Sequence, residues 1–246
     1  MELNKDYEDY EQFDKDQEKE INEKTRINFM RKVYGILFIQ LILTTIFILI
    51  PQYPTIKNQL IKFHMEHYYQ MFIISLLSGI LSIISFIFLF INSKKVPLNY
   101  FLLFSFTFFE SISLIFITYE YQFESIILAF TITAGCTFGL TIYALTTKTN
   151  FTIFGGIVFS LFFMFFFGTL MFCLIGFNID NTIFNVIGGI FASFYIIYDT
   201  QLICGKFGNK FSIDDYMIAA ISVYIDVINL FIYILRIIGK KSIEKK

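Results

Sequence analysis

Seven long apolar runs alternate with short polar segments along the chain. Each run has about 20 residues, the length that an α-helix needs to cross a hydrocarbon core of about 30 Å. Isolated strands would leave backbone groups unsatisfied in lipid, and the alternation of barrel strands is absent. The sequence therefore predicts an all-α, polytopic membrane helix bundle with seven transmembrane helices. The predicted helices are Val33 to Ile50, Met71 to Ile91, Leu98 to Ile117, Ser125 to Tyr143, Phe151 to Phe172, Ile183 to Ile203 and Met217 to Ile238.

Residues that end or begin helices stand at these boundaries. Pro51 and Pro54 follow the first run, Pro97 precedes the third, and Gly205 follows the sixth. Ser212, with Asp215 three residues later, has the spacing of a capping box before the last helix. Small residues four apart predict close helix packing, and the pairs are Gly135 with Gly139, Gly188 with Ala192, and Gly189 with Ser193.

The charged residues are concentrated at the start of the chain. Of the 246 residues, 56% are hydrophobic and 16% charged, whereas a soluble domain has about 25% charged residues. Residues 1 to 32 alone carry 7 basic and 10 acidic side chains. We expect a disordered, cytosolic tail at 1–32, a membrane domain at 33–238 and a basic tail at 239–246. The net charge of −1, without a broad basic face, excludes a nucleic-acid partner.

The basic residues of the loops predict the orientation in the membrane. Nine lie on the side of the N-terminus, and only Lys57 and Lys62 lie on the other side. The positive-inside rule therefore places the N-terminus in the cytosol. The lysines after the last run would face the opposite side after seven crossings. Either this tail departs from the rule, or the last segment does not fully cross, and seven spans are favoured.

Three acidic residues lie inside the apolar runs, namely Glu110, Asp199 and Asp226. An ionised carboxylate near the centre of a bilayer costs about 2.5–3.5 kcal/mol on insertion scales. Such residues therefore need partners or a function, and we favour function over purely structural hydrogen bonds between helices.

Helical spacing places polar and small residues on single faces of three predicted helices. Steps of three and four residues connect Asp215, Ala219, Ser222, Asp226, Asn229, Tyr233, Arg236 and Lys240 in the last helix. Shorter sets are Gly188, Ala192, Tyr195 and Asp199 in the sixth, and Thr107, Glu110 and Ser113 in the third. We expect the long face to look into the bundle or a wet cavity, while apolar residues cover the other faces.

Two runs near the C-terminus carry a family resemblance. The run from Ile197 to Gln201 (IYDTQ) and the run from Ala219 to Phe231 (AAISVYIDVINLF) resemble the transmembrane Bax inhibitor motif family. Its Lifeguard, or Golgi anti-apoptotic, branch is favoured by shorter matches over about residues 31 to 236. These are Arg31 to Tyr34, Pro97 to Tyr100, Phe106 and Thr107 with Glu110, and Tyr143 to Lys148.

The resemblance implies seven helices around a central C-terminal helix in an intracellular membrane, the Golgi or the endoplasmic reticulum. It implies a pH-sensitive calcium leak channel that lowers store calcium and inhibits apoptosis. In that family, the aspartates matching Asp199 and Asp226 form a proton-sensitive pair beside the ion path. Acidic positions near Asp214 and Asp215 are linked to conduction. Two such carboxyl groups can share one proton and titrate as a pair.

The resemblance also assigns the expected ligands and partners. Calcium is the transported ion, bound transiently by Asp199 and Asp226, and no cofactor is expected. Glu110, Ser222 and Asn229 are expected along the ion path or in polar contacts between helices. The expected partners are the lipid bilayer, calcium ions, protons and anti-apoptotic membrane proteins. Bacterial members carry an acid and an arginine in the second helix, which this chain lacks, so an arginine latch on Asp199 is not expected.

Other functions remain open on the sequence. A titrating pair could serve a proton-coupled calcium exchanger, and the protein could be a scaffold that acts only through partners. An intramembrane aspartyl protease is disfavoured because Asp226 lacks the Gly-x-Gly-Asp context of such enzymes. We therefore expect no enzyme activity. His64 and His67, with Glu66, have too few further ligands for a metal site and predict a solvated loop.

Overall fold

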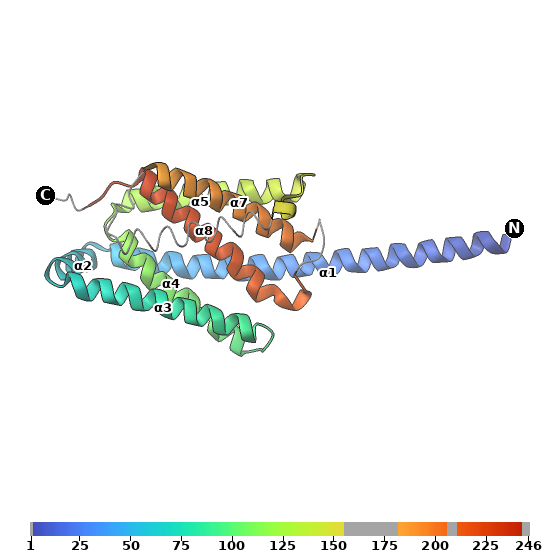
Figure 1. Cartoon of the computed structure of the whole chain (residues 1–246), viewed down its shortest axis with the longest axis horizontal. Helices are drawn as coiled ribbons and strands as arrows, with labels where there is room; N and C mark the ends of the chain where they lie inside the picture. The colour runs from blue at the N-terminus through green and yellow to red at the C-terminus, as the bar shows by residue number, and fades with distance from the viewer. Residues whose placement is uncertain (1, 155–181, 206–210, 243–246) are drawn as a thin grey trace.

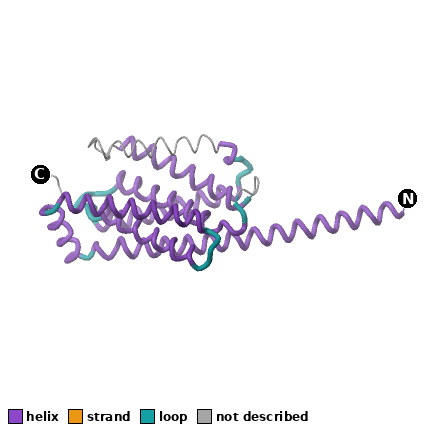
Figure 2. Tube along the Cα trace, turned by 60° about the horizontal axis from the view of Figure 1, so that its bottom comes forward, coloured by secondary structure: helices purple, strands orange, loops and turns teal. Residues whose placement is uncertain are grey.

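The structure is a computed structural model that describes residues 2–154, 182–205 and 211–242. Its helices run side by side, and its loops gather at the two ends of the bundle (Figures 1 and 2). The α-helices are α1 (Glu2–Leu49), α2 (Pro54–Glu66), α3 (Tyr68–Asn92), α4 (Leu98–Thr118), α5 (Phe123–Thr146), α7 (Thr182–Cys204) and α8 (Tyr216–Ile238). Short 3₁₀ turns are η1 (Ile50–Gln52), η2 (Phe151–Phe154) and η3 (Ile213–Asp215). The described residues form no β-strand beyond an isolated bridge between Tyr121 and Lys241.

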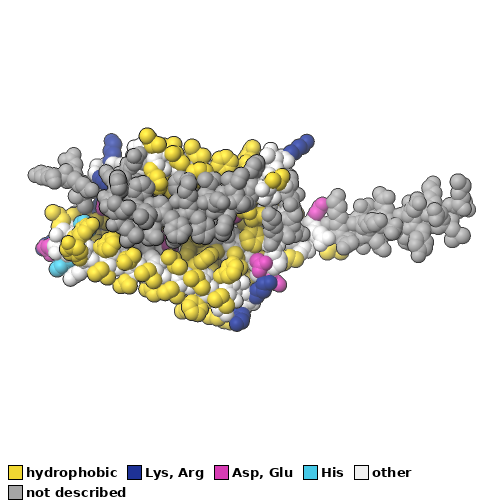
Figure 3. Space-filling model, viewed as in Figure 1, with side chains coloured by type: hydrophobic (Ala, Val, Ile, Leu, Met, Phe, Trp, Pro, Cys, Tyr) yellow, Lys and Arg dark blue, Asp and Glu magenta, His cyan; other side chains and the backbone are white. Residues whose placement is uncertain are grey.

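Six described helices are long and apolar enough to cross a membrane, and they correspond to six of the seven predicted spans. The fold class, an all-α polytopic membrane bundle, is therefore confirmed. The predicted span from Phe151 to Phe172 lies mostly outside the described residues, and its first four residues form η2 rather than α-helix. Figure 3 shows hydrophobic side chains over the flank of the bundle and charged ones near its ends, as a lipid environment requires.

Helix α8 occupies the centre of the bundle. Val223, Tyr224, Phe231 and Leu235 of α8 are almost completely inaccessible to solvent. We expected the polar positions of this helix to be interior and the apolar ones to cover its other faces. The structure instead buries apolar positions such as Val223, Val227 and Leu230, because α1, α4, α5 and α7 all contact α8. On the predicted polar face, Ala219 and Asp226 are buried, but Ser222, Asn229, Tyr233 and Arg236 are only half-buried.

The first helix differs from the sequence-based expectation. Disorder was expected for residues 1 to 32, with the helix beginning at Val33, but α1 is continuous from Glu2. Many residues in this segment are Glu, Lys and Gln, which favour helix, and a helix extended from an existing one avoids the cost of nucleation. The division into tail, membrane domain and basic tail stays a prediction.

The helix boundaries follow the predicted signals. Helix α1 ends at Leu49 before Pro51, and Pro54 opens α2, a helix that the apolar pattern did not predict. Gly205 has a φ of 67°, the left-handed conformation that glycine adopts readily after a helix. The capping box is also confirmed, since the Asp215 carboxylate accepts hydrogen bonds from the backbone and side chain of Ser212.

The C-terminal tail pairs with the turn between α4 and α5. The Gln122 N–H donates to the Lys240 carbonyl at 2.8 Å, and the Ser242 N–H donates to the Glu120 carbonyl at 2.6 Å. The Lys241 ammonium lies 3.3 Å from the Glu120 carboxylate. Helix α8, with 23 residues and thus about 35 Å long, spans the bundle and ends opposite the projecting part of α1 (Figure 1). Helix α8 is therefore long and apolar enough to cross a membrane, and the side on which the tail lies stays a prediction.

Candidate functional site

The two aspartates singled out by the sequence meet at the interface of α7 and α8. The carboxyl groups of Asp199 and Asp226 lie within hydrogen-bonding reach of each other. Asp226 is 8% exposed and Asp199 is half-buried. A hydrogen bond between two carboxyl groups requires a proton on one of them. The geometry therefore suits a pair that holds one proton.

The surroundings of the pair offer few groups that could compensate a negative charge on it. The Oδ2 atom of Asp226 is buried and accepts no hydrogen bond from a donor among the described residues. No ion pair joins either aspartate to a basic side chain within that part of the chain. A doubly ionised pair in such surroundings would combine mutual repulsion with the cost of charge in the membrane. Ionisation of both carboxyl groups would therefore oppose the contact between the two helices.

Close packing also brings α7 and α8 together near Gly188, away from the aspartate pair. A Cβ atom added at Gly188 would lie 2.5 Å from the Tyr233 ring, whereas one added at Gly189 would lie 3.8 Å from Tyr233 Cβ. Gly188 and Ala192 are both buried. The small residues predicted to allow a close neighbour thus face α8, while added Cβ atoms at Gly135 and Gly139 of α5 would meet nothing within 4 Å.

The other polar positions of α8 have varied surroundings. Ser222 and Asn229 are half-buried, and the Ser222 hydroxyl donates to the Ile218 carbonyl of its own helix at 3.1 Å. Asp214 is exposed in η3. The expected roles of these three residues in an ion path stay predictions.

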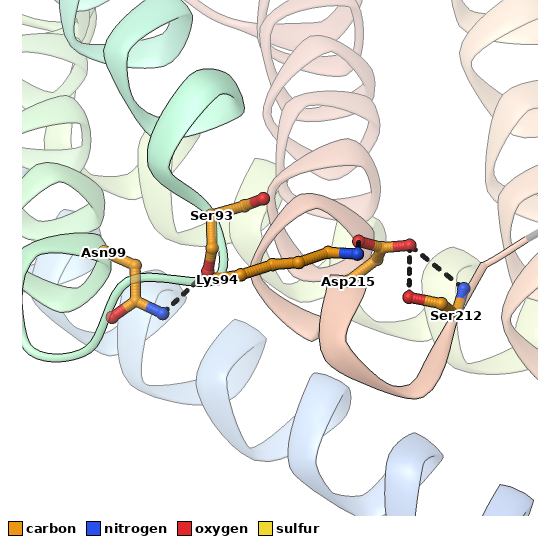
Figure 4. Close-up of polar contacts among 5 residues, drawn as sticks. All are labelled: Ser93, Lys94, Asn99, Ser212 and Asp215. Atoms are coloured by element: carbon orange, nitrogen blue, oxygen red, sulfur yellow. Dashed lines mark hydrogen bonds and ion pairs between the residues drawn. The ribbon is translucent and has the colours of Figure 1, made fainter.

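Asp215 connects α8 to the loop between α3 and α4. Its carboxylate lies 3.6 Å from the Lys94 ammonium and also caps η3 through Ser212 (Figure 4). Near the start of α4, the Asn99 side chain donates to the Ser93 carbonyl of this loop at 2.7 Å. Asp215 is thus held in a polar junction at the end of the bundle and is separate from the aspartate pair.

Glu110 lies in a different interface from the aspartate pair. Its carboxylate accepts a hydrogen bond of 3.0 Å from the Ser82 hydroxyl of α3, and Ser78 and Ser113 are joined at 2.8 Å nearby. Glu110 and Ser113 thus face α3, as polar contacts between helices require. The described structure joins Glu110 to neither Asp199 nor Asp226.

A buried polar network joins α1, α4 and α8, and the sequence pattern predicted only part of it. The Gln40 amide donates to the Thr107 hydroxyl at 3.0 Å, and the Thr44 and Tyr224 hydroxyls are 2.7 Å apart. The Ser111 hydroxyl donates to the Thr44 hydroxyl at 3.4 Å. Only Thr107 had been singled out. The available signal was the presence of Gln and Thr, four residues apart, within the first apolar run.

Arg26 ties α1 to the end of α7. Its guanidinium donates to the Leu202 carbonyl at 2.7 Å and to the Phe211 carbonyl at 3.0 Å. Leu202 lies in the last turn of α7, where carbonyl groups lack partners within the helix. The arginine therefore binds backbone near the pair, rather than Asp199 itself. The sequence pattern had indicated only its contribution to orientation.

At the opposite end, α2 packs against the turn after α4. Lys57 donates to the Gln52 side chain at 2.9 Å and to the Tyr121 carbonyl, and burial lowers the pKa of Lys57. The His64 ring contacts the Tyr119 ring, with 5.6 Å between their centroids. Within the described ranges, no three His, Cys, Asp or Glu side chains are grouped to hold a metal ion. Transient calcium binding at the aspartate pair stays a prediction.

Comparison with known proteins identifies the family. The family model "Inhibitor of apoptosis-promoting Bax1" matches residues 26–243. This range includes both aspartates and the six described spans, apart from the first residues of the span in α1. The chain belongs to this family.

Individual relatives place the chain in the Lifeguard and Golgi anti-apoptotic branch. It is 31% identical to Protein lifeguard 4 of Mus musculus over 228 residues, which cover 90% of this chain and 87% of that protein. It is 30% identical to the Golgi anti-apoptotic protein of Vaccinia virus (strain Lister) over 214 residues, covering 87% and 85%. Protein lifeguard 3 of Homo sapiens is 26% identical over 240 residues, covering 89% and 70%. The resemblance inferred from the sequence motifs is confirmed.

Proposed function

We propose that this protein is a pH-sensitive calcium leak channel of an intracellular membrane, where it lowers store calcium and inhibits apoptosis. The observation that carries the proposal is the contact between the Asp199 and Asp226 carboxyl groups on two membrane-spanning helices. The names of the relatives support an anti-apoptotic role and a Golgi location. The proposal assigns the chain no catalytic step, and calcium is its cargo rather than a cofactor.

The mechanism follows from the charge of the pair. With one shared proton, the two carboxyl groups attract each other and hold α7 against α8. As the pH rises and that proton is lost, two negative charges face each other in a medium of low dielectric constant and repel. This repulsion loosens the helix contact and changes the path beside it, and the carboxylate oxygens supply the ligand type that Ca²⁺ prefers.

The test is calcium efflux from liposomes that contain the purified protein, measured between pH 5 and pH 8. We expect efflux from wild-type liposomes to change with pH and efflux from Asp226→Asn liposomes to be flat, because the amide cannot lose a proton in this range. Asp199→Asn should behave in the same way. Glu66→Gln is the matched control, since Glu66 is an exposed acid of α2 and should leave the pH profile unchanged.

Four results would contradict the proposal. A wild-type profile indistinguishable from that of empty vesicles would remove the channel function. Calcium movement driven uphill by a pH gradient would replace a leak by a proton-coupled exchanger. Wild-type flux that both aspartate variants leave unchanged would remove the pair from the mechanism, and apoptosis inhibition without any flux would favour a scaffold.

A further inference from the structure

Arg26 of α1 joins the two chain segments that carry the aspartate pair. Its Nη2 atom donates to the carbonyl of Leu202, in the last turn of α7, at 2.7 Å. Its Nη1 atom donates at 3.0 Å to the carbonyl of Phe211, which precedes η3 and α8. One guanidinium therefore connects the end of the helix with Asp199 to the segment that leads into the helix with Asp226. The planar fork of arginine suits such a bridge, because its donors point in fixed directions.

Helix α1 makes a second contact with α7 beside the pair. The hydroxyls of Tyr34 and Thr200 are 3.1 Å apart, and Thr200 directly follows Asp199 in the chain. Together with the bond from Arg26 to the Leu202 carbonyl, α1 thus holds α7 at two places within the turn that follows Asp199. The position of this part of α7 depends on α1.

The positive charge of Arg26 is not neutralised by a carboxylate. Within the described residues, Arg26 forms no ion pair, and its Nε atom is buried without a hydrogen-bond partner. The guanidinium also lies over the Phe29 ring, 4.8 Å from its centroid. The groups that offset this charge are therefore backbone carbonyls and a ring face.

This charge lies at the end of α7 where the helix dipole is negative. The C-terminal end of a helix has the effect of about half a negative charge. Leu202 comes three residues after Asp199, a rise of about 4.5 Å along the helix axis. The negative end of the dipole therefore lies close to the pair, where it disfavours ionisation of the carboxyl groups, and Arg26 offsets this effect.

The other described ionisable groups leave Arg26 as the charged side chain bound to this helix end. Those nearest to Asp199 and Arg26 are uncharged at neutral pH, and they are Tyr34 of α1 with Tyr198 and Cys204 of α7. Charged groups of the same helices lie elsewhere: Asp215 and Arg236 about three turns from Asp226 along α8, Lys32 of α1 over the Tyr216 ring, and Glu124 in the first turn of α5.

We propose that Arg26 is a positioning residue for the aspartate pair, which ties the end of α7 to the segment before α8 and sets the pH at which the pair loses its shared proton. The inference rests on the proposed function, because it concerns the regulation of the same pair. Arg26 acts through the backbone carbonyls of Leu202 and Phe211 and through its charge.

The test is the pH profile of calcium efflux from liposomes with the full-length protein, together with infrared titration of the carboxyl band that Asp226→Asn removes. Arg26→Gln removes the charge, so the midpoints of both curves should move to higher pH by about 0.3 to 1 unit. Arg26→Lys keeps the charge without the fork, and its midpoints should lie nearer to those of the wild type. Arg31→Gln is the matched control, because Arg31 is an exposed arginine of α1 without a hydrogen bond or ion pair to the described residues.

The two measurements separate a failure of this inference from a failure of the proposed function. Melting temperatures first establish that each variant is folded. Wild-type efflux without pH dependence would overturn the proposed function, whereas an infrared midpoint that moves in Arg26→Gln would still support the role of Arg26. Midpoints in Arg26→Gln equal to those in Arg31→Gln would overturn the inference. Equal shifts in Arg26→Lys and Arg26→Gln would overturn the role of the charge.

Discussion

Buried polar residues in this protein fall into two kinds that differ in their hydrogen bonds. The Thr44 and Tyr224 hydroxyls satisfy each other at 2.7 Å between α1 and α8. The carboxyl groups of Asp199 and Asp226 contact each other, but Oδ2 of Asp226 has no donor within the described residues. A satisfied pair stabilises a helix interface, whereas two carboxyl groups in contact titrate as a pair, and the proposed function rests on that titration.

This distinction predicts different effects for two neighbouring threonines. Thr44→Val leaves the buried Tyr224 hydroxyl without its partner and should lower the free energy of unfolding by about 1–2 kcal/mol. Thr45→Val should have a smaller effect, because the Thr45 hydroxyl donates to the Leu41 carbonyl of its own helix. Thermal melting in detergent measures both changes.

A double-mutant cycle checks the cause. Tyr224→Phe in the Thr44→Val background should add little further destabilisation, since the bond between the two hydroxyls is already lost. Fully additive losses would show that the two residues act independently and would contradict the predicted coupling.

The antiparallel contact of α7 and α8 is the element on which the candidate site depends. Small residues of α7 let the Tyr233 side chain of α8 lie directly on Gly188. This close approach and the aspartate contact are separated by about three helical turns on α7, so both report on the same interface. A change in the helix spacing at Gly188 should therefore reach the carboxyl groups.

Gly188→Ala should destabilise this interface. Its Cβ would lie 2.5 Å from ring atoms of Tyr233, and overpacking of this kind costs about 1–3 kcal/mol. Gly189→Ala is the control, because its Cβ would make an ordinary contact at 3.8 Å. The measurement is the melting temperature of each variant. Tyr233→Leu should recover part of the loss in Gly188→Ala, and equal melting of the two alanine variants would contradict the close contact.

At the scale of the whole molecule, the two ends of the bundle have distinct connections. The end from which α1 projects contains the Arg26 contacts to α7 and the loop before α8, and the Lys94 contact to Asp215. The opposite end contains α2 and the C-terminal tail, which pairs with the turn after α4. The central helix α8 is thereby fixed at both ends, and the described start of α1 and the described tail after α8 lie toward opposite ends of the structure (Figure 1).

This arrangement predicts that the termini lie on opposite sides of the membrane. In sealed vesicles from cells, a protease added outside should digest a tag at the N-terminus and spare a tag at the C-terminus, because basic loop residues favour the cytosolic side. Immunoblotting of each tag measures the outcome, and detergent should expose both tags. Digestion of both tags in intact vesicles would contradict a crossing by α8.

The amino-acid sequence by itself determined the membrane fold and the family. It also predicted the ends of six spans to within three residues, except for the start of α1. Hydrophobic runs and membrane carboxylates carry large free energies, so they are visible without a structure. Helical spacing also indicated that Gly188 and Asp199 share a face of α7, and both face α8 in the structure.

Only the tertiary structure decided which distant residues meet. It separated Glu110 from the aspartate pair, placed Arg26 on carbonyl groups of the backbone, and joined Thr44 to Tyr224. The periodicity of one helix fixes the direction of each side chain around its own axis. It contains no information on which neighbour that face will contact, because helix order, tilt and rotation arise from packing among all the helices.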